Sequence, residues 1–271
     1  RRSADLFMPA RPPCALGHDV VGVVVRVGAG VKHFKTGEEV YASPDDFQVG
    51  TFAEYVPVKE SSLAIKPKNV SMEEAAALPL VALTAWQILV ERANIRAGQK
   101  VFIQAGSGGV GTIAIQLARY LGAQVATTTS TANVDWVKSL GADVVVDYKQ
   151  ADFEEVLSGY DVVLNSQDST TLEKSFNVLK SGGQVISISG PPDAGFAEAQ
   201  KLAWPFKQLM RVLSFNARRK AKNRNASYSF LFMKASGEQL RQIAALIESG
   251  AIRPIVDKVF PFTSTNEAMA Y

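Results

Sequence analysis

Residues 101–111 read Val-Phe-Ile-Gln-Ala-Gly-Ser-Gly-Gly-Val-Gly. The apolar run at their start predicts a buried strand, and the following segment, 112–121, carries apolar residues at helical spacing. A strand, a glycine-rich turn and a helix in succession place a phosphate on the N–H groups that open the helix. Glycine lets the backbone approach that phosphate, which a Cβ would prevent. The turn Ala105-x-x-Gly108-x-x-Gly111 therefore predicts a dinucleotide site, with Ala where such turns usually begin with Gly.

Downstream of this turn, short apolar strands alternate with segments of helical periodicity. This spacing predicts a parallel sheet with helices on both faces. Six strands match the doubly wound dinucleotide-binding fold, so we predict an α/β domain of the Rossmann type over residues 83–251. The strands are predicted at 101–105, 124–128, 144–146, 161–164, 184–188 and 228–232, and the helices at 109–121, 133–140, 152–157, 171–179 and 238–249.

Residues 1–82 have a different pattern, with short β-rich runs separated by Gly and Pro, which indicates a compact barrel or folded sheet. A further β-like run follows the last predicted helix and is expected to return to this first domain. The β-rich domain would then comprise residues 1–82 with 252–271. The runs are at 20–27, 40–42, 51–58, 63–65 and 255–260.

The composition limits the possible classes of protein. The chain has 271 residues, and it lacks the run of about 18 apolar residues that would span a membrane. Lys and Arg number 29 against 26 Asp and Glu, a balance that argues against nucleic acid as a partner. The single cysteine, Cys14, excludes an internal disulfide and is consistent with a reducing compartment. We predict a cytoplasmic protein with no nucleic-acid or membrane partner.

The segment 191–227 is predicted to be the least regular part of the chain, because it contains three prolines and few periodic apolar residues. It also carries a basic group. We interpret this group as part of a solvated lid or helix end rather than as a nucleic-acid patch. The group consists of Arg218, Arg219, Lys220, Lys222 and Arg224.

The choice of nucleotide depends on the end of the second strand. An Asp or Glu there would bind the 2′-hydroxyl of NAD and repel the 2′-phosphate of NADP. Here a threonine-rich sequence continues through Ser130 to Asn133, and no carboxylate occurs before Asp135. Hydroxyl and amide groups donate hydrogen bonds to phosphate, so this loop favours NADPH, with Lys149 beside Tyr148 as a source of positive charge. Helix capping is the alternative role for Ser130 and Asn133.

Several separated motifs follow one another along the chain: Gly17-His18-Asp19-x-x-Gly22, Val27-Gly28-x-Gly30-Val31, Gly37-Glu38-Glu39-Val40-Tyr41, Gly50-Thr51-Phe52-Ala53-Glu54-Tyr55, Ala75-Ala76-Ala77-Leu78-Pro79, Leu83-Thr84-Ala85-Trp86 and the glycine turn. Their order resembles the medium-chain dehydrogenase/reductase superfamily over nearly the whole chain. Within it, the sequence is most similar to the zinc-free quinone oxidoreductase and alkenal/enone reductase branch. The resemblance implies a GroES-like substrate domain joined to the dinucleotide domain, with NADPH in the cleft between them.

The resemblance also implies which residues contact the cofactor. The pyrophosphate is expected at the glycine turn, the 2′-phosphate at the ends of the second and third strands, and the nicotinamide near Thr84, for which helix capping or packing is an alternative role. The ends of the last three strands are expected to line the cleft. The candidates are Ser107, Gly108, Gly109 and Val110 for the pyrophosphate, Ser130, Asn133 and Tyr148 for the 2′-phosphate, and Leu164, Ser189, Gly190 and Phe230 for the cleft wall.

The Gly-His-Asp motif also resembles the signature of zinc alcohol dehydrogenases, in which the His binds a catalytic zinc. Such a site needs three protein ligands. Here Cys14 lies only four residues before His18, no second Cys exists, and residues 80–86 contain no Cys where the zinc enzymes place a ligand. We therefore predict no metal site.

Without a metal or an evident acid–base pair, the chemistry is expected to come from the cofactor and from positioning. NADPH would transfer hydride to a quinone or to the β-carbon of an enal or enone. No catalytic residue is identified, since Tyr41 and Tyr55 are interpreted as core aromatics. An enoyl-thioester reductase is an alternative, and so is a non-catalytic NADPH-binding sensor like the crystallin-like members of the branch. The resemblance further implies a homodimer joined through strand 228–232, whose exposed edge is suited to pairing.

Two features depart from the pattern of this family. Residues 165–168, Asn-Ser-Gln-Asp, replace the expected Asp-x-x-Gly-Gly turn after the fourth strand, which would alter the cofactor wall. The chain begins at Arg1 inside the first domain and stops at Tyr271 before the usual closing strand. We therefore expect the sequence to be a fragment of a longer protein.

Overall fold

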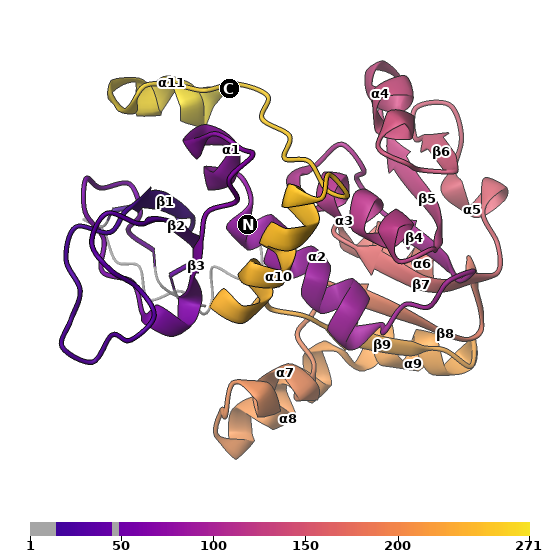
Figure 1. Ribbon diagram of the computed structural model, residues 1–271. Helices are drawn as coiled ribbons and strands as arrows, with labels where there is room; N and C mark the ends of the chain where they lie inside the picture. The colour runs from indigo at the N-terminus through magenta and orange to yellow at the C-terminus, as the bar shows by residue number, and fades with distance from the viewer. Residues whose placement is uncertain (1–14, 45–48) are drawn as a thin grey trace.

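The computed structural model describes residues 15–44 and 49–271, and Figure 1 shows a smaller and a larger part side by side. The larger part contains a six-stranded parallel sheet in the order β6-β5-β4-β7-β8-β9, which is the order of a doubly wound dinucleotide fold. The predicted α/β architecture and all six predicted strands are confirmed. The strands are β4 (Lys100–Ile103), β5 (Gln124–Thr129), β6 (Val144–Asp147), β7 (Tyr160–Asn165), β8 (Leu179–Ser187) and β9 (Ser227–Phe230).

All five predicted helices are present, although the helix predicted at 171–179 ends at Ser175. Its last residues were assigned wrongly because Leu179 pairs with Tyr160 and begins β8. The α-helices are α1 (Met72–Ala76), α2 (Pro79–Trp86), α3 (Gly109–Tyr120), α4 (Val134–Ser139), α5 (Phe153–Val156), α6 (Ser169–Ser175), α7 (Ala194–Ala199), α8 (Trp204–Leu213), α9 (Phe215–Asn223), α10 (Gly237–Glu248) and α11 (Thr265–Ala270), with short helical turns η2 (Glu60–Ser62), η3 (Gln87–Arg92), η4 (Thr131–Asn133) and η5 (Phe262–Ser264).

Helices cover both faces of the large sheet. Successive side chains of a strand point to opposite sides, so apolar residues on both faces have to be buried. In β4, Val101 and Ile103 face a core that includes residues of α2, α3 and α10. Phe102, between them, faces a second core that includes residues of α5, α6 and α9. Both faces of the central strand are thus dry, as in other parallel sheets.

In the smaller part, β1 (Val20–Val23), β2 (Glu39–Ala42) and β3 (Leu63–Ile65) form an antiparallel sheet. The runs predicted as strands at 51–58 and 255–260 are not strands. An extended run becomes a strand only when a neighbour accepts and donates its backbone hydrogen bonds, and within the described ranges no strand pairs with these two runs. Tyr41 is fully buried, whereas Tyr55 is 73% exposed, so the core interpretation holds for Tyr41 and is wrong for Tyr55.

The segment 191–227, predicted to be irregular, instead contains α7, α8 and α9. Asp193 is the N-cap of α7, and its carboxylate accepts a hydrogen bond from the N–H of Phe196 at 2.9 Å. Pro205 lies in the first turn of α8, where the missing N–H removes no helical hydrogen bond. The prediction of irregular structure was wrong because Asp193 and Pro205 lie at the starts of helices, where they do not interrupt the helical hydrogen bonds.

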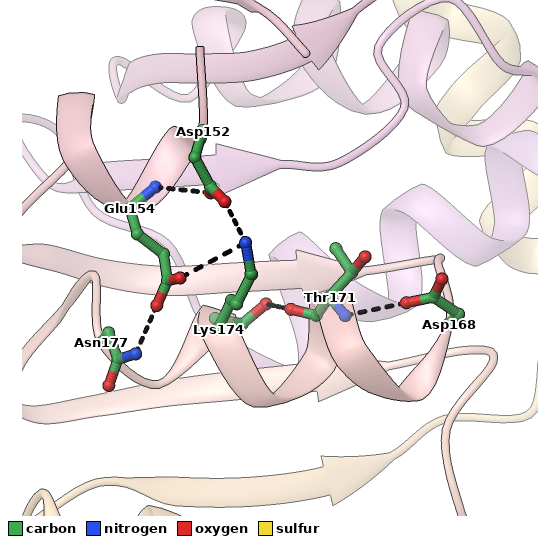
Figure 2. Close-up of polar contacts among 7 residues, drawn as sticks. Asp152, Glu154, Asp168, Thr171, Lys174 and Asn177 are labelled. Atoms are coloured by element: carbon green, nitrogen blue, oxygen red, sulfur yellow. Dashed lines mark hydrogen bonds and ion pairs between the residues drawn. The ribbon is translucent and has the colours of Figure 1, made fainter. Parts of the chain in front are cut away.

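Capping residues and one lysine fix the two short helices α5 and α6 (Figure 2). Asp152 caps α5 by accepting the N–H of Glu154 at 3.2 Å, and Asp168 caps α6 by accepting the N–H of Thr171 at 2.8 Å. Lys174 of α6 forms ion pairs with Asp152 and Glu154. The hydrogen bond from Lys174 lowers the pKa of Asp152. These contacts join the two helices on one face of the sheet.

Helix α10 connects the two parts of the molecule. The hydroxyl of Tyr41 in β2 donates to the carbonyl oxygen of Leu240 in α10 at 2.6 Å. A Cβ on Gly237 would lie 2.2 Å from the carbonyl oxygen of Leu63, so only glycine allows α10 to approach β3 this closely. The last helix of the larger part therefore packs directly against the small sheet.

Candidate dinucleotide site

The glycine turn lies between β4 and α3, as the sequence predicts. The N–H of Gly106 donates to Thr128 O at 2.8 Å, and the N–H of Gly108 donates to Ala105 O at 2.9 Å. A Cβ on Gly111 would lie 2.2 Å from Ala105 O, so α3 can begin this close to the turn only with glycine there. Ala105 itself has a φ of 53°, a left-handed conformation that costs a non-glycine residue about 1–2 kcal/mol. The turn is tight and carries some strain.

The first turn of α3 presents backbone donors. Gly108 is its N-cap residue and has no side chain to cap the helix. In the part of the chain that the structure describes, the N–H groups of Gly109, Val110 and Gly111 have no acceptor. These donors lie at the positive end of the helix dipole, which attracts anions. The arrangement fits a pyrophosphate.

The end of β5 lies beside this turn. The hydroxyl of Thr129 donates to the hydroxyl of Ser107 at 3.1 Å. Just after β5, the side-chain amide of Asn133 donates to Ser130 Oγ at 3.4 Å. Tyr148 follows β6, donates its N–H to Thr129 O at 3.1 Å and is 61% exposed. The structure thus brings together Ser107, Ser130, Asn133 and Tyr148, which follow the carboxyl ends of β4, β5 and β6.

Asp147, the last residue of β6, was not predicted as part of this region. Its carboxylate accepts hydrogen bonds from the hydroxyl of Thr131 at 2.6 Å and from the N–H of Lys149 at 3.0 Å. The hydrogen bond from Thr131, followed by that from Lys149, lowers the pKa of Asp147. The carboxylate holds the loop that contains Ser130 in place. The signal in the sequence was an Asp directly before Tyr148 at a strand end.

A buried hydrogen-bond network closes the ends of β4, β7 and β8. Asn165 donates through Nδ2 to Gln104 Oε1 at 2.7 Å and accepts from Ser187 Oγ at 2.6 Å. Gln104 in turn donates to Ser175 Oγ at 2.7 Å. All four side chains are at most 1% exposed. Ser187 Oγ also accepts the N–H of Gly190 at 2.8 Å, so the network fixes the loop after β8.

Ser189 lies in the same loop as Gly190. Its hydroxyl donates to Gln167 O and lies 3.4 Å from Asn165 Oδ1. Ser189 is partly exposed, whereas Gly190 is buried. Ser189 is therefore held against residues 165–168, and Gly190 against Ser187.

Three predicted cofactor residues are occupied with other protein groups. Thr84 is 4% exposed, and its hydroxyl donates to Leu80 O, one turn earlier within α2, at 2.7 Å, which fits packing, one of the two alternative roles, and is not a helix cap. Leu164 is fully buried in the core. Phe230 is buried and meets the ring of Phe196 edge-on, with the ring centroids 5.3 Å apart. The side chains of these three residues contribute to packing.

Asp19 of the Gly-His-Asp motif links the two parts of the molecule. Its carboxylate accepts the N–H of Leu80, in the first turn of α2, at 2.8 Å. Burial raises the pKa of the Asp19 carboxyl to about 7, and the hydrogen bond from Leu80 offsets only part of that rise. This role was not predicted, because it depends on a contact between residues 61 positions apart.

We expect Asp19 to make the stability of the protein fall as the pH rises from about 4 to about 7. The folded state holds this proton more tightly than the unfolded chain, so folding takes up a proton in that range and the free energy of unfolding decreases, by about 2–4 kcal/mol. Asp19→Asn should remove this fall, since Asn still accepts from Leu80 but does not titrate. Urea unfolding of both proteins between pH 4 and 8 measures the difference. Parallel curves for the two proteins would refute this role.

His18 does not lie in a cluster of metal ligands within the described residues, where no three His, Cys, Asp or Glu side chains gather. Cys14, the other residue considered for zinc, lies outside the described residues. A hollow of about 1080 Å³ lies between β1 and residues 53–58 of the smaller part. None of the predicted cofactor residues lines this hollow, so it is separate from the glycine turn.

Comparison with known proteins identifies the family. The family described as alcohol dehydrogenase GroES-like domain matches residues 3–68, and the family described as zinc-binding dehydrogenase matches residues 140–271. The chain is 35% identical to an NADPH-dependent alkenal/one oxidoreductase, chloroplastic, of Arabidopsis thaliana, over 100% of this chain and 62% of that protein. The chain therefore spans less than two thirds of that relative.

Two further similarities cover more of the related protein. A chloroplast envelope quinone oxidoreductase homolog of Arabidopsis thaliana is 34% identical over 97% of this chain and 78% of the relative. The crystal structure of Escherichia coli quinone oxidoreductase complexed with NADPH superposes with a TM-score of 0.75 and 26% identity, over 98% of this chain and 80% of that one. The chain belongs to the medium-chain dehydrogenase/reductase superfamily, in the branch of the quinone and alkenal oxidoreductases.

Proposed function

We propose that this chain belongs to an NADPH-dependent reductase that transfers hydride to quinones or to the activated C=C bond of enals and enones, without zinc. The observation that carries the proposal is the glycine turn with unpaired N–H groups at the start of α3. A relative named for NADPH-dependent alkenal/one oxidation and reduction, and a structural neighbour that contains NADPH, support the cofactor and the substrate class. The lack of a second cysteine supports a zinc-free site.

The described residues fit a phosphorylated nicotinamide dinucleotide. The N–H groups of Gly109 and Val110 would bind the pyrophosphate. Ser130, Asn133 and Tyr148 would donate hydrogen bonds to the 2′-phosphate, at the strand ends where the ribose lies in such folds. When bound, NADPH supplies the hydride. The protein would contribute orientation and exclusion of water, and among the described residues beside the turn we identify no acid–base pair.

Steady-state oxidation of NADPH with a panel of enals, enones, quinones and enoyl thioesters tests this function. We expect turnover with quinones, enals or enones. Turnover with enoyl thioesters alone would favour a thioester reductase, and tight NADPH binding without turnover of any substrate would favour a sensor. Either of the last two outcomes would contradict the proposal.

We expect Ser130→Asp to reduce the preference for NADPH over NADH by about tenfold to a hundredfold. A carboxylate at this position would repel the 2′-phosphate, an effect of about 1–3 kcal/mol, while accepting the 2′-hydroxyl of NADH. The ratio of kcat/KM for the two coenzymes measures it. Ser130→Ala is the matched control, because it removes the donor without adding charge and should change the ratio less. Equal ratios in the Asp variant and the unmodified protein would show that Ser130 lies away from the phosphate.

We further propose a homodimer joined through β9, a cytoplasmic location, and a domain division into residues 1–82 with 252–271 and residues 83–251. β9 is the edge strand of the large sheet, and an edge with unpaired backbone groups is suited to pairing with a second copy. The single cysteine supports a reducing compartment. The position of α10 against β3 supports a firm connection between the two domains.

A further inference from the structure

Helix α8 and the start of α9 carry an exposed apolar face that the proposed reductase does not use. In Figure 1, α7 and α8 project away from the large sheet. Six large apolar side chains on α8 and at the start of α9 are between 46% and 72% exposed. Single exposed apolar side chains are common on protein surfaces, but a group of neighbouring ones is unusual. These side chains, which we call the apolar face of α8, are Trp204, Phe206, Leu209, Val212, Leu213 and Phe215.

The other side of α8 anchors the helix to the protein. Met210 and Ser214 are fully buried, and the hydroxyl of Ser214 donates to Met210 O at 2.7 Å. Lys207 forms an ion pair with Glu198 of α7. Since these contacts fix one side of the helix, the apolar face is held outward. The outward apolar face is thus part of the folded state and not a consequence of fraying.

The segment around this face is strongly basic. Residues 199–237 contain nine Lys and Arg residues and no Asp or Glu. Arg218 donates to Arg211 O at 2.7 Å and to Ser214 Oγ at 3.1 Å, so the basic group begins directly beside the end of α8. Arg219 and Lys222 are exposed, and neither forms an ion pair within the described ranges. The surface therefore combines exposed apolar side chains with unneutralised positive charge.

We propose that α8 and α9 bind peripherally to the surface of an anionic lipid bilayer. The apolar face of α8 would enter the region between head groups and acyl chains, and Arg219 and Lys222 of α9 would bind lipid phosphates. A second copy of the chain fits this surface less well, because a symmetric contact would set like charges against each other. The proposal is independent of the proposed function.

This inference changes one expectation from the sequence. We expected no membrane partner because the chain lacks an apolar run long enough to span a bilayer. Among the described residues, the structure likewise contains no helix with the length and hydropathy of a membrane span. An interfacial helix needs neither, since it lies in the plane of the surface and requires only one apolar face.

Sedimentation with vesicles tests the proposal. We expect the protein to bind vesicles of phosphatidylcholine that contain phosphatidylglycerol, and to bind vesicles of phosphatidylcholine alone far more weakly. Phe206→Ser combined with Val212→Ser should weaken binding at least about tenfold, because both side chains lose insertion into the bilayer. Arg219→Gln combined with Lys222→Gln should weaken binding about tenfold on anionic vesicles only. All four side chains are exposed, so the fold and the oxidation of NADPH should be unchanged.

Matched controls lie elsewhere on the surface. Val156→Ser in α5 removes a valine that is 52% exposed, and Lys138→Gln in α4 removes an exposed lysine. Neither should change vesicle binding. Equal losses in these controls, or no binding to anionic vesicles, would overturn the proposal. The proposal would also be overturned if the protein did not bind vesicles but self-associated, and if Phe206→Ser with Val212→Ser abolished that self-association. A second copy of the chain would then cover the apolar face of α8.

Discussion

Replacing Gly108 with Asp is expected to weaken NADPH binding strongly while leaving the fold intact. Gly108 has φ −80° and ψ 164°, an extended conformation open to any residue, and it is the N-cap of α3. An Asp there would accept the N–H of Val110 or Gly111, as N-cap side chains do. It would occupy the donors and place a negative charge where the pyrophosphate binds. The loss of one hydrogen bond to a charged group costs about 1.5–3 kcal/mol, and repulsion between the carboxylate and the pyrophosphate adds to it, so NADPH binding should weaken at least about 100-fold.

The matched control for this change is Gly108→Asn. Both side chains place a Cβ 3.2 Å from Ala105 O, and both can cap the helix, so the two variants share any steric cost. Only Asp adds charge. Fluorescence titration with NADPH measures binding, and thermal unfolding checks that both variants keep the stability of the unmodified protein within about 1 kcal/mol. If the Asp variant binds NADPH as tightly as the Asn variant, the pyrophosphate does not lie at the start of α3.

Much of the larger domain could be predicted from sequence because its signals are local. Val162, Val163 and Leu164 of β7 are consecutive and all buried, as expected of a strand covered on both faces. The glycine turn is equally local, since Gly111 is required by the close approach of one strand and the next helix. Such features need no knowledge of distant residues.

The features that were missed depend on distant contacts. The outward apolar face of α8 has the periodicity of a core helix, yet only Met210 and Ser214 of that helix region are buried. Periodicity shows that a face exists but not what covers it. Likewise, the contact of Asp19 with Leu80 joins residues 61 positions apart, and no local pattern around Asp19 indicates it. Functional contacts of this kind become visible only in the folded structure.

Asn165→Leu is expected to destabilise the larger domain by about 3–5 kcal/mol, the largest stability effect that we predict. The side chain of Asn165 is fully buried, and it links Gln104 Oε1 to Ser187 Oγ. Leucine has a similar volume but forms no hydrogen bonds. The buried acceptor Gln104 Oε1 and the buried donor Ser187 Oγ would therefore both lose their partner. Each such loss costs about 1–3 kcal/mol, because burial prevents replacement by water. Urea unfolding measures the change.

Ser166→Ala is the matched control for Asn165→Leu, because the hydroxyl of Ser166 lies 3.4 Å from Gln104 O and is only partly buried. Its removal should cost at most about 0.5 kcal/mol. Asn165→Leu should also weaken NADPH binding, since Ser187 orients the loop of Ser189 and Gly190 that faces the proposed cofactor site. A loss of stability without a loss of binding would assign the network to the core alone. A loss of both would show that the residues replacing the usual turn of this family shape the cofactor wall.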